Sequence, residues 1–194
     1  PLPSVAFVTP HKATYFKPLY EAFARAQPEG WRTVVVWPEH HRSEHPLESL
    51  TPSAANLEIR RVAARGQGRT FLPGADLVRA LEAALPRLIV MHEYSPFSLG
   101  ALWFARKRKI PVVVVTEVGR RNRGFFSRRT QGWHAFWGRF IDGIAAACPA
   151  AHEPLSGRSL PSVAIYHAMD SRSYRPPERK THSAVTFAYL GQLI

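Results

Sequence analysis

The stretch LIVMHEYSPFSLGALWFARKRKIPVVVVTE, residues 88–117, decides the fold. It holds two unbroken apolar runs, 88–91 and 112–115, on either side of a helical stretch at 97–109. Apolar runs without polar alternation predict strands that are covered on both faces. Two such strands joined by one amphipathic helix predict a βαβ unit, and therefore a parallel sheet.

Ionisable residues follow both of these predicted strands. His92 and Glu93 come after the first strand, and Glu117 comes after the second. In open parallel sheets, ligands bind at the carboxyl ends of the strands. The stretch therefore predicts a crevice that these three side chains face.

The rest of the chain extends the same pattern. Further strands are predicted at 4–9, 33–37, 57–62, 143–148 and 162–166, and further helices at 17–26 and 75–85. The alternating pattern at 57–62 indicates a more exposed, edge-type strand. Together these elements predict an α/β fold: a Rossmann-like, doubly wound, mainly parallel sheet with helices on both faces. The turn after the first strand lacks Gly-x-Gly-x-x-Gly, so it offers no dinucleotide phosphate cradle.

The domain organisation is predicted from where the apolar pattern stops and restarts. Residues 1–166 form the Rossmann-like domain, and the polar, proline-containing segment 167–184 is a linker. Residues 185–194 are the first strand of a second domain that is truncated here.

The chain has 194 residues, of which 26 are Lys or Arg and 14 are Asp or Glu, a formal net charge of +12. Such an excess favours a phosphate-bearing partner: nucleic acid, anionic lipid or a phosphorylated substrate. The single cysteine, Cys148, excludes an internal disulfide and fits a reducing compartment. No apolar run is long enough to span a bilayer and no signal peptide is evident, so a cytoplasmic location is expected.

Three segments allow alternative interpretations. The three histidines and two carboxylates at 39–46 suggest a metal site, but two prolines bracket them without regular spacing, so a polar loop is favoured and no metal is predicted. The Gly/Arg segment 65–69 is interpreted as a flexible loop. The aromatic residues at 133–141 recur at helical spacing, either packing on the sheet or lying in a membrane interface beside the upstream arginines.

The order of motifs resembles the N-terminal domain of retaining GT-B glycosyltransferases of family 4, the group 1 transferases. The likeness rests on five stretches that span nearly the whole chain: YFKPLYEAFARA (15–26), IVMHEYSP (89–96), IPVVVVTEVG (110–119), YHAMDSRSYRP (166–176) and FAYLGQLI (187–194). Two departures stand out. Glu117 occupies the place where many family members have a histidine, and His167-Ala168 replaces an Asn-Gly pair in the linker.

The resemblance implies transfer of a sugar from a nucleotide-sugar donor to an acceptor, with retention of configuration. It implies a catalytic role for Glu117 and His92. Acceptor binding is expected from His11, Lys12, Thr14, Glu93, Tyr94, Arg120 and Arg121. No cofactor and no metal are expected. The donor would bind to the missing C-terminal domain, so this fragment alone is expected to be inactive.

Each of these roles has a structural alternative. Glu117 can pair with Arg120 or Arg121 at the surface, and His92 can be a ring bonded to backbone. For the whole chain, the alternative function is a non-enzymatic, basic nucleic-acid-binding module, which the absence of any known nucleic-acid-binding signature disfavours. Peripheral attachment to an anionic membrane surface is compatible with the transferase hypothesis.

Overall fold

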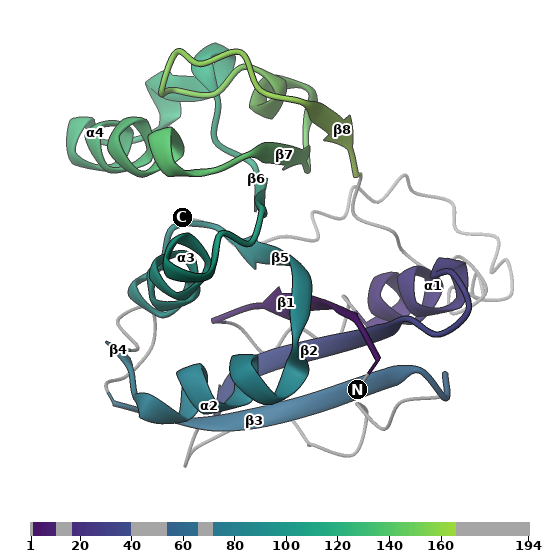
Figure 1. The fold of residues 1–194 in the computed structure, drawn as a ribbon. Helices are drawn as coiled ribbons and strands as arrows, with labels where there is room; N and C mark the ends of the chain where they lie inside the picture. Colours follow the sequence, from purple (N-terminus) through teal and green to yellow (C-terminus); the bar gives the residue numbers. More distant parts are fainter. Residues whose placement is uncertain (1, 11–16, 40–53, 66–71, 166–194) are drawn as a thin grey trace, which may run out of the picture.

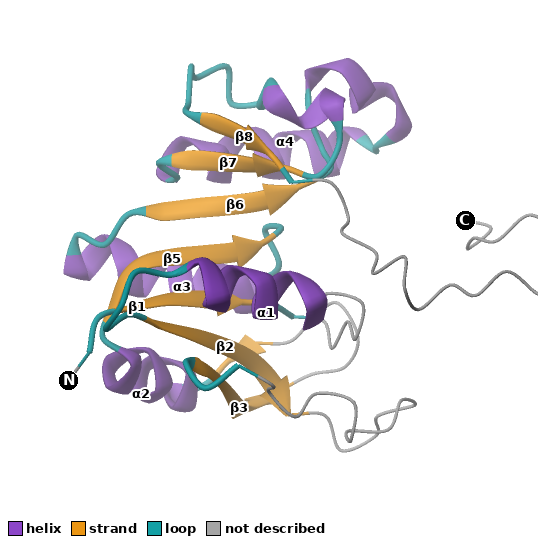
Figure 2. Ribbon diagram, turned by 90° about the vertical axis from the view of Figure 1, so that its right-hand side faces the viewer, coloured by secondary structure: helices purple, strands orange, loops and turns teal. Residues whose placement is uncertain are grey.

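The computed structural model of the protein describes residues 2–10, 17–39, 54–65 and 72–165. Eight strands form one sheet in the order β4-β3-β2-β1-β5-β6-β7-β8, and helices cover both faces (Figures 1 and 2). All neighbours pair in parallel except β3 and β4. The α/β doubly wound fold predicted from the sequence is confirmed.

The strands are β1 (Ser4–Val8), β2 (Arg32–Glu39), β3 (Leu57–Arg65), β4 (Leu72–Pro73), β5 (Pro86–His92), β6 (Val112–Thr116), β7 (Gly143–Ala146) and β8 (Ser162–Ala164). The α-helices are α1 (Lys17–Ala26), α2 (Ala75–Ala84), α3 (Pro96–Arg108) and α4 (Arg128–Trp137). Three short 3-10 helices follow the later strands: η4 (Arg120–Phe125), η5 (Gly138–Phe140) and η6 (Pro149–His152).

The βαβ unit predicted at 88–117 lies in the middle of the sheet. β5 pairs with β1 on one side and with β6 on the other. In this register His92 lies beside Val115, so β5 and β6 end at the same edge of the sheet. The two strands point in the same direction, as the arrowheads in Figure 2 show.

Separate apolar clusters fill the two faces of the sheet. On one face, α1 contributes Tyr20 and Ala24, which pack with Phe7 and Trp37. On the other face, α2 and α3 cover a larger cluster whose biggest fully buried side chain is Phe97. This is why the central strands, such as β1 and β2, are apolar at successive positions: their residues are covered on both faces of the sheet.

Helix α3 begins and ends where its sequence dictates. The Ser95 hydroxyl accepts a hydrogen bond from the Ser98 amide at 3.1 Å, and Pro96 occupies the first turn. At the other end Lys109 adopts the left-handed conformation, with φ of 56°. Pro111 follows and cannot continue the helix, so the chain turns directly into β6.

The structure departs from the sequence predictions at three places. β4 is a two-residue antiparallel strand, too short to give a periodic pattern, and it places β3 next to the edge. Trp103, an apolar residue in the helix predicted at 97–109, is 57% exposed. The aromatic stripe of α4 is divided, because Trp137 packs against the core while Trp133, Phe136 and Phe140 stay largely exposed.

The predicted linker and second-domain strand, 167–194, lie outside the described residues, so the domain boundaries stay a prediction. Within the part of the chain that the structure describes, no helix has the length and apolar character needed to cross a bilayer.

Candidate functional site

The site begins at Glu93, the first residue after β5. Its backbone has a φ of 54°, a left-handed conformation that non-glycine residues seldom adopt. Strained backbone of this kind gathers at functional sites. The turn is held from both sides, because the Glu93 amide donates to the Val115 carbonyl at 3.0 Å and the Ser98 hydroxyl donates to the His92 carbonyl at 3.0 Å.

The Glu93 carboxylate reaches across to the end of β6. The Thr116 hydroxyl donates to its Oε2 at 3.0 Å, and the Glu117 amide donates to its Oε1 at 2.9 Å. One side chain thus bridges the ends of two neighbouring strands, in the place where the next backbone hydrogen bonds of the ladder would lie.

The backbone of Glu117 is fixed at both of its polar atoms. Its amide donates to Glu93, and its carbonyl accepts from Asn122 Nδ2 at 2.7 Å and from the Cys148 thiol at 3.2 Å. The Glu117 residue itself is exposed. The arrangement therefore presents a carboxylate to solvent from a backbone that has little freedom to move.

Close packing holds the loop after β6 in place. A Cβ added to Gly119 would lie 1.9 Å from the Ala150 carbonyl oxygen, so no other residue fits there without a backbone shift. The Gly119 amide also donates to Asn122 Oδ1 at 2.8 Å. The loop that carries Glu117 is therefore anchored on the segment after β7.

Burial changes the acid–base properties of Glu93. It raises the pKa of the Glu93 carboxyl from 4.5 to about 7; the hydrogen bonds from Glu117 and Thr116 oppose this rise, and the Glu117 charge adds to it. Near neutral pH a substantial fraction of Glu93 therefore carries a proton.

His134 of α4 lies on the other side of Glu93. Its Nε2 is 3.8 Å from Glu93 Oε2, and burial lowers the pKa of His134 from 6.5 to about 4. The Tyr94 ring stands edge-on to the imidazole, with 4.8 Å between centroids, and burial together with the Glu93 charge raises the pKa of Tyr94. Between about pH 4 and 7 the carboxyl and the imidazole are thus both mainly uncharged.

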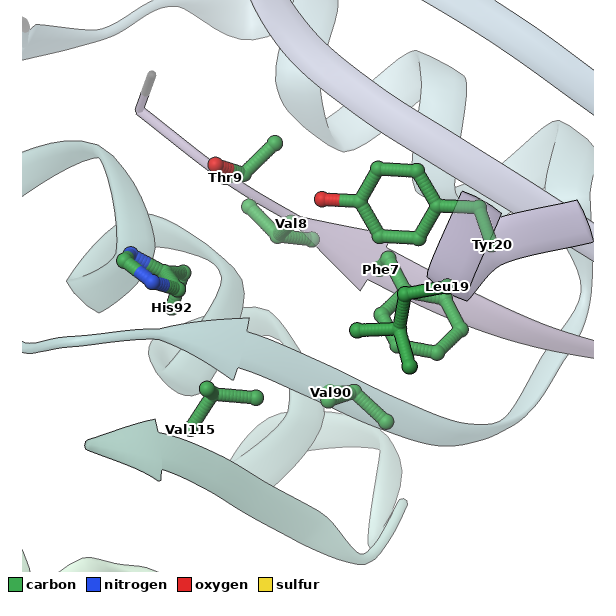
Figure 3. Close-up of a pocket in the computed structure, with 8 residues that line it drawn as sticks. All are labelled: Phe7, Val8, Thr9, Leu19, Tyr20, Val90, His92 and Val115. Carbon is green, nitrogen blue, oxygen red and sulfur yellow. The ribbon is translucent and has the colours of Figure 1, made fainter. Parts of the chain in front are cut away.

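His92 lines a separate small hollow between β1, β5 and α1 (Figure 3). Thr9 lies at the end of β1, and the Tyr20 hydroxyl is on the side of its ring that faces Thr9. Apolar side chains form most of the remaining wall. His92 thus belongs to the hollow on the α1 side, while its neighbour Glu93 belongs to the β6 side.

The two arginines predicted to hold an acceptor phosphate lie farther along the chain, beside the segment that follows β7. Arg121 donates to Glu153 Oε1 through Nε at 2.9 Å and Nη2 at 2.6 Å, so its partner is Glu153 rather than Glu117. Arg120 lines a shallow cavity with Glu153, Gly157 and Arg158. The structure therefore does not show these two side chains beside Glu93.

The predicted site residues consequently fall into three groups. Glu93 and Glu117 meet at the ends of β5 and β6, where the buried Tyr94 packs against His134; His92 faces the separate hollow on the α1 side; Arg120 and Arg121 lie with Glu153. His11, Lys12 and Thr14 lie outside the described residues. Thr116 and His134 were missed, because only the folded chain brings them to Glu93.

The histidine-rich segment lies almost wholly outside the described residues. In the described part of the chain, no three His, Cys, Asp or Glu residues cluster as metal ligands would. The expectation that no metal takes part stays a prediction.

Comparison with protein-family models finds no match, and comparison with curated proteins finds none. Solved structures do match in fold. Staphylococcus aureus MnaA, in a co-structure with UDP, aligns with a TM-score of 0.59 at 16% identity over 93% of this chain and 50% of its own. Anabaena HepE, in complex with UDP and glucose, gives 0.57 at 13% identity over 90% and 47%.

A third match is the UDP-GlcNAc 2-epimerase of Neisseria meningitidis bound to UDP-GlcNAc, with a TM-score of 0.55 at 13% identity over 84% of this chain and 46% of its own. The chain spans about half the length of these structures. At such low identity the likeness concerns the fold alone, an α/β Rossmann-like fold that matches about half of each of these structures.

Proposed function

We propose that this chain is the acceptor-side domain of a retaining glycosyltransferase that uses a nucleotide-sugar donor. The fold supports the proposal, because solved structures of that fold hold UDP or a UDP-sugar. The observation that carries it is the exposed Glu117 carboxylate, presented at the carboxyl edge of the sheet by a backbone bonded at both polar atoms. The donor would bind a C-terminal domain that faces this edge.

Glu117 has the chemistry that the reaction needs. Departure of a nucleoside diphosphate leaves positive, oxocarbenium-like charge on the sugar, and a fixed carboxylate stabilises such charge. Because the Glu117 backbone is bonded at both polar atoms, only its side-chain torsions are left to order when the substrate arrives. Glu117 would face the reacting carbon or the acceptor hydroxyl, and His92 would act from the hollow on the α1 side of the same sheet edge.

Glu93 would act on Glu117 rather than on the substrate. Both of its oxygens are engaged by the end of β6, and it fixes the amide from which Glu117 extends. In this role Glu93 is a positioning residue. Arg120, exposed in the shallow cavity after β7, remains the candidate for a phosphate on the acceptor.

Donor binding and stereochemistry test the proposal together. Isothermal titration of the protein with its proposed C-terminal domain, against UDP, GDP and ADP and their sugars, should give binding by at least one nucleoside diphosphate. NMR of the product should then show the anomeric configuration of the donor. Binding by none of them, or an inverted product, would overturn the corresponding part of the proposal. The 194 residues alone should show no transfer.

The same experiment separates transfer from epimerisation. Several structures with this fold are described as UDP-N-acetylglucosamine 2-epimerases. Conversion of the donor to its 2-epimer, with no sugar appearing on any acceptor, would assign that reaction instead. The comparisons do not favour the nucleic-acid-binding alternative.

A further inference from the structure

Four large aromatic side chains are exposed on α3, on α4 and on the 3-10 helix η5 that follows α4. They are Trp103 (57% exposed), Phe136 (49%), Trp133 (43%) and Phe140 (40%), and we call them the aromatic belt. Contiguous apolar surface is uncommon on soluble monomeric proteins and marks a binding surface. Neither the sheet nor the carboxyl-edge site uses these side chains.

Two hydrogen bonds link the α3 segment to α4 and to η5. The Trp133 indole donates to the Tyr94 carbonyl, just before α3, at 2.7 Å. Near the end of α3, Arg106 Nε donates to the Phe140 carbonyl at 2.8 Å. Both helices lie on the side of the sheet opposite α1 (Figure 1). Trp103 lies one turn before Arg106, on the same side of α3 as the arginine that reaches Phe140.

The rings of the belt on α4 and η5 are held in place, because they pack on one another and on Trp137. Phe136 meets Trp137 at 5.0 Å and Phe140 at 5.5 Å between ring centroids, both in edge-to-face geometry. Trp137 in turn packs against the core. The exposed rings are thus fixed in position and need little ordering when they bind.

Basic side chains flank the belt. Residues 97–109 contain four basic and no acidic residues, and residues 125–142 contain three basic residues and one acidic residue. The cations lie in the last turn of α3 and the first turn of α4, with Arg139 just after α4. Lys107, Arg128 and Arg129 are exposed, and within the described ranges none of them forms an ion pair.

We propose that this surface of α3 and α4 docks the protein on an anionic lipid bilayer. Tryptophan and phenylalanine insert at the level of the lipid headgroups, and Lys and Arg beside them attract anionic headgroups. The sequence suggested a membrane interface at 133–141 beside the upstream arginines, which include Arg128 and Arg129. The structure adds Trp103 and the basic end of α3.

Two other occupants fit the belt less well. A single-stranded nucleic acid needs open ring faces for stacking, but the α4 rings pack edge-to-face and Lys107 Nζ lies 3.9 Å over the Trp103 ring. Protein interfaces are depleted of lysine, whereas Lys107 lies over the Trp103 ring within this belt. The proposal concerns where the protein works, and it stands if the reaction at the strand edge proves to be a different one.

Liposome co-sedimentation tests the proposal, with vesicles of phosphatidylcholine alone or mixed with phosphatidylglycerol. The wild type should bind the mixed vesicles and should lose affinity as salt rises. The double variants Trp103→Ser/Phe136→Ser and Lys107→Glu/Arg129→Glu should each lose at least about tenfold in affinity, since each basic residue near the surface contributes about fivefold. Circular dichroism would confirm that both variants fold.

Matched control variants change exposed side chains that lie outside the belt. Leu2→Ser/Leu72→Ser removes two apolar residues that are 52% and 56% exposed, and Arg61→Glu/Arg87→Glu reverses two exposed charges. Both should stay within about twofold of the wild type apart from the general effect of net charge. Equal binding to neutral vesicles, or equal losses in controls and belt variants, would overturn the proposal. So would a belt-dependent dimer in light scattering, or belt-dependent binding of oligo-uridine, with vesicles ignored.

Discussion

The carboxyl edge of β5 and β6 differs from the aromatic belt of α3 and α4 in which side chains are buried. The edge partly buries a polar side chain, whereas the belt exposes apolar ones. At the edge, Glu93 is partly buried, and its two carboxylate oxygens accept hydrogen bonds from the Thr116 hydroxyl and the Glu117 amide. In the belt, large apolar rings stay in water although the core lies next to them. Hydrogen bonds fix the backbone at the edge, whereas the belt leaves apolar surface exposed for binding. The contrast indicates one region for chemistry and another for attachment.

The tightest contact of the edge should give the largest effect. Gly119→Ala places a Cβ against the Ala150 carbonyl and should destabilise the fold by about 3 kcal/mol, because backbone cannot yield as a side-chain tip can. Gly132→Ala in α4 has open space around it and should instead stabilise by roughly 0.5–1 kcal/mol. Urea unfolding measures both. Equal effects of the two would contradict the anchored loop.

Removal of the carboxylate bridge comes next. Glu93→Ala leaves the Glu117 amide and the Thr116 hydroxyl without their acceptor and should cost about 2 kcal/mol of unfolding free energy. Glu153→Ala removes an exposed pair with Arg121 and should cost less than about 0.5 kcal/mol. If the two variants melt at the same temperature, Glu93 does not hold the edge together.

The pH dependence of stability distinguishes Glu93 from His134. Between about pH 4.5 and 7, Glu93 is protonated in the folded protein but ionised in the unfolded chain. The contribution of Glu93 to the free energy of unfolding therefore falls as pH rises through this range. Between about pH 4 and 6.5, His134 is neutral in the folded protein but protonated in the unfolded chain. The contribution of His134 to the free energy of unfolding therefore grows as pH rises through this range. In the wild type the two slopes oppose one another.

Removing one of these two groups should reveal the pH dependence of stability that the other group causes. From pH 4.5 to 6.5, stability should rise in Glu93→Gln relative to wild type and fall in His134→Gln, by on the order of 2 kcal/mol each. Unfolding free energies at four pH values measure this, with Glu153→Gln as control. Parallel curves for all the proteins would mean that neither group is perturbed by burial.

The smallest effect on stability is expected from the N-terminal cap of α4, the helix that carries Trp133 and Phe136 of the belt. The Ser127 hydroxyl caps α4 by accepting from the Thr130 amide at 3.2 Å. Ser127→Ala should lower stability by about 1 kcal/mol, whereas Ser127→Asp should keep the cap. A loss of vesicle binding in Ser127→Ala but not in Ser127→Asp would link the order of α4 to docking.

The sequence predicts the centre of this fold well, because unbroken apolar runs have few alternatives to a covered parallel strand. The runs at 88–91 and 112–115 therefore place Glu93 and Glu117 at one edge before any coordinates are known. β4 escapes prediction because two residues carry no period. The edge-type character of β3 follows from the same alternation that marks its half-exposed face.

The details of the site depend on contacts that no local pattern encodes. Glu93 resembles any polar residue after a strand until its left-handed turn is seen to aim it at β6. His134 is one polar residue in an amphipathic helix, and only the packing of α4 brings it to Glu93. Helical spacing likewise identifies the aromatic stripe but not which of its rings the core leaves uncovered.

The division between edge and belt is tested most directly by hydrolysis of a nucleotide-sugar with water as acceptor, followed as nucleoside diphosphate release by the protein with its proposed C-terminal domain and without membranes. Glu117→Gln should slow release by roughly 100-fold or more, the scale of one fixed electrostatic group. Trp103→Ser/Phe136→Ser should release at the wild-type rate. Unchanged release in Glu117→Gln, or an equal loss in both variants, would contradict the account.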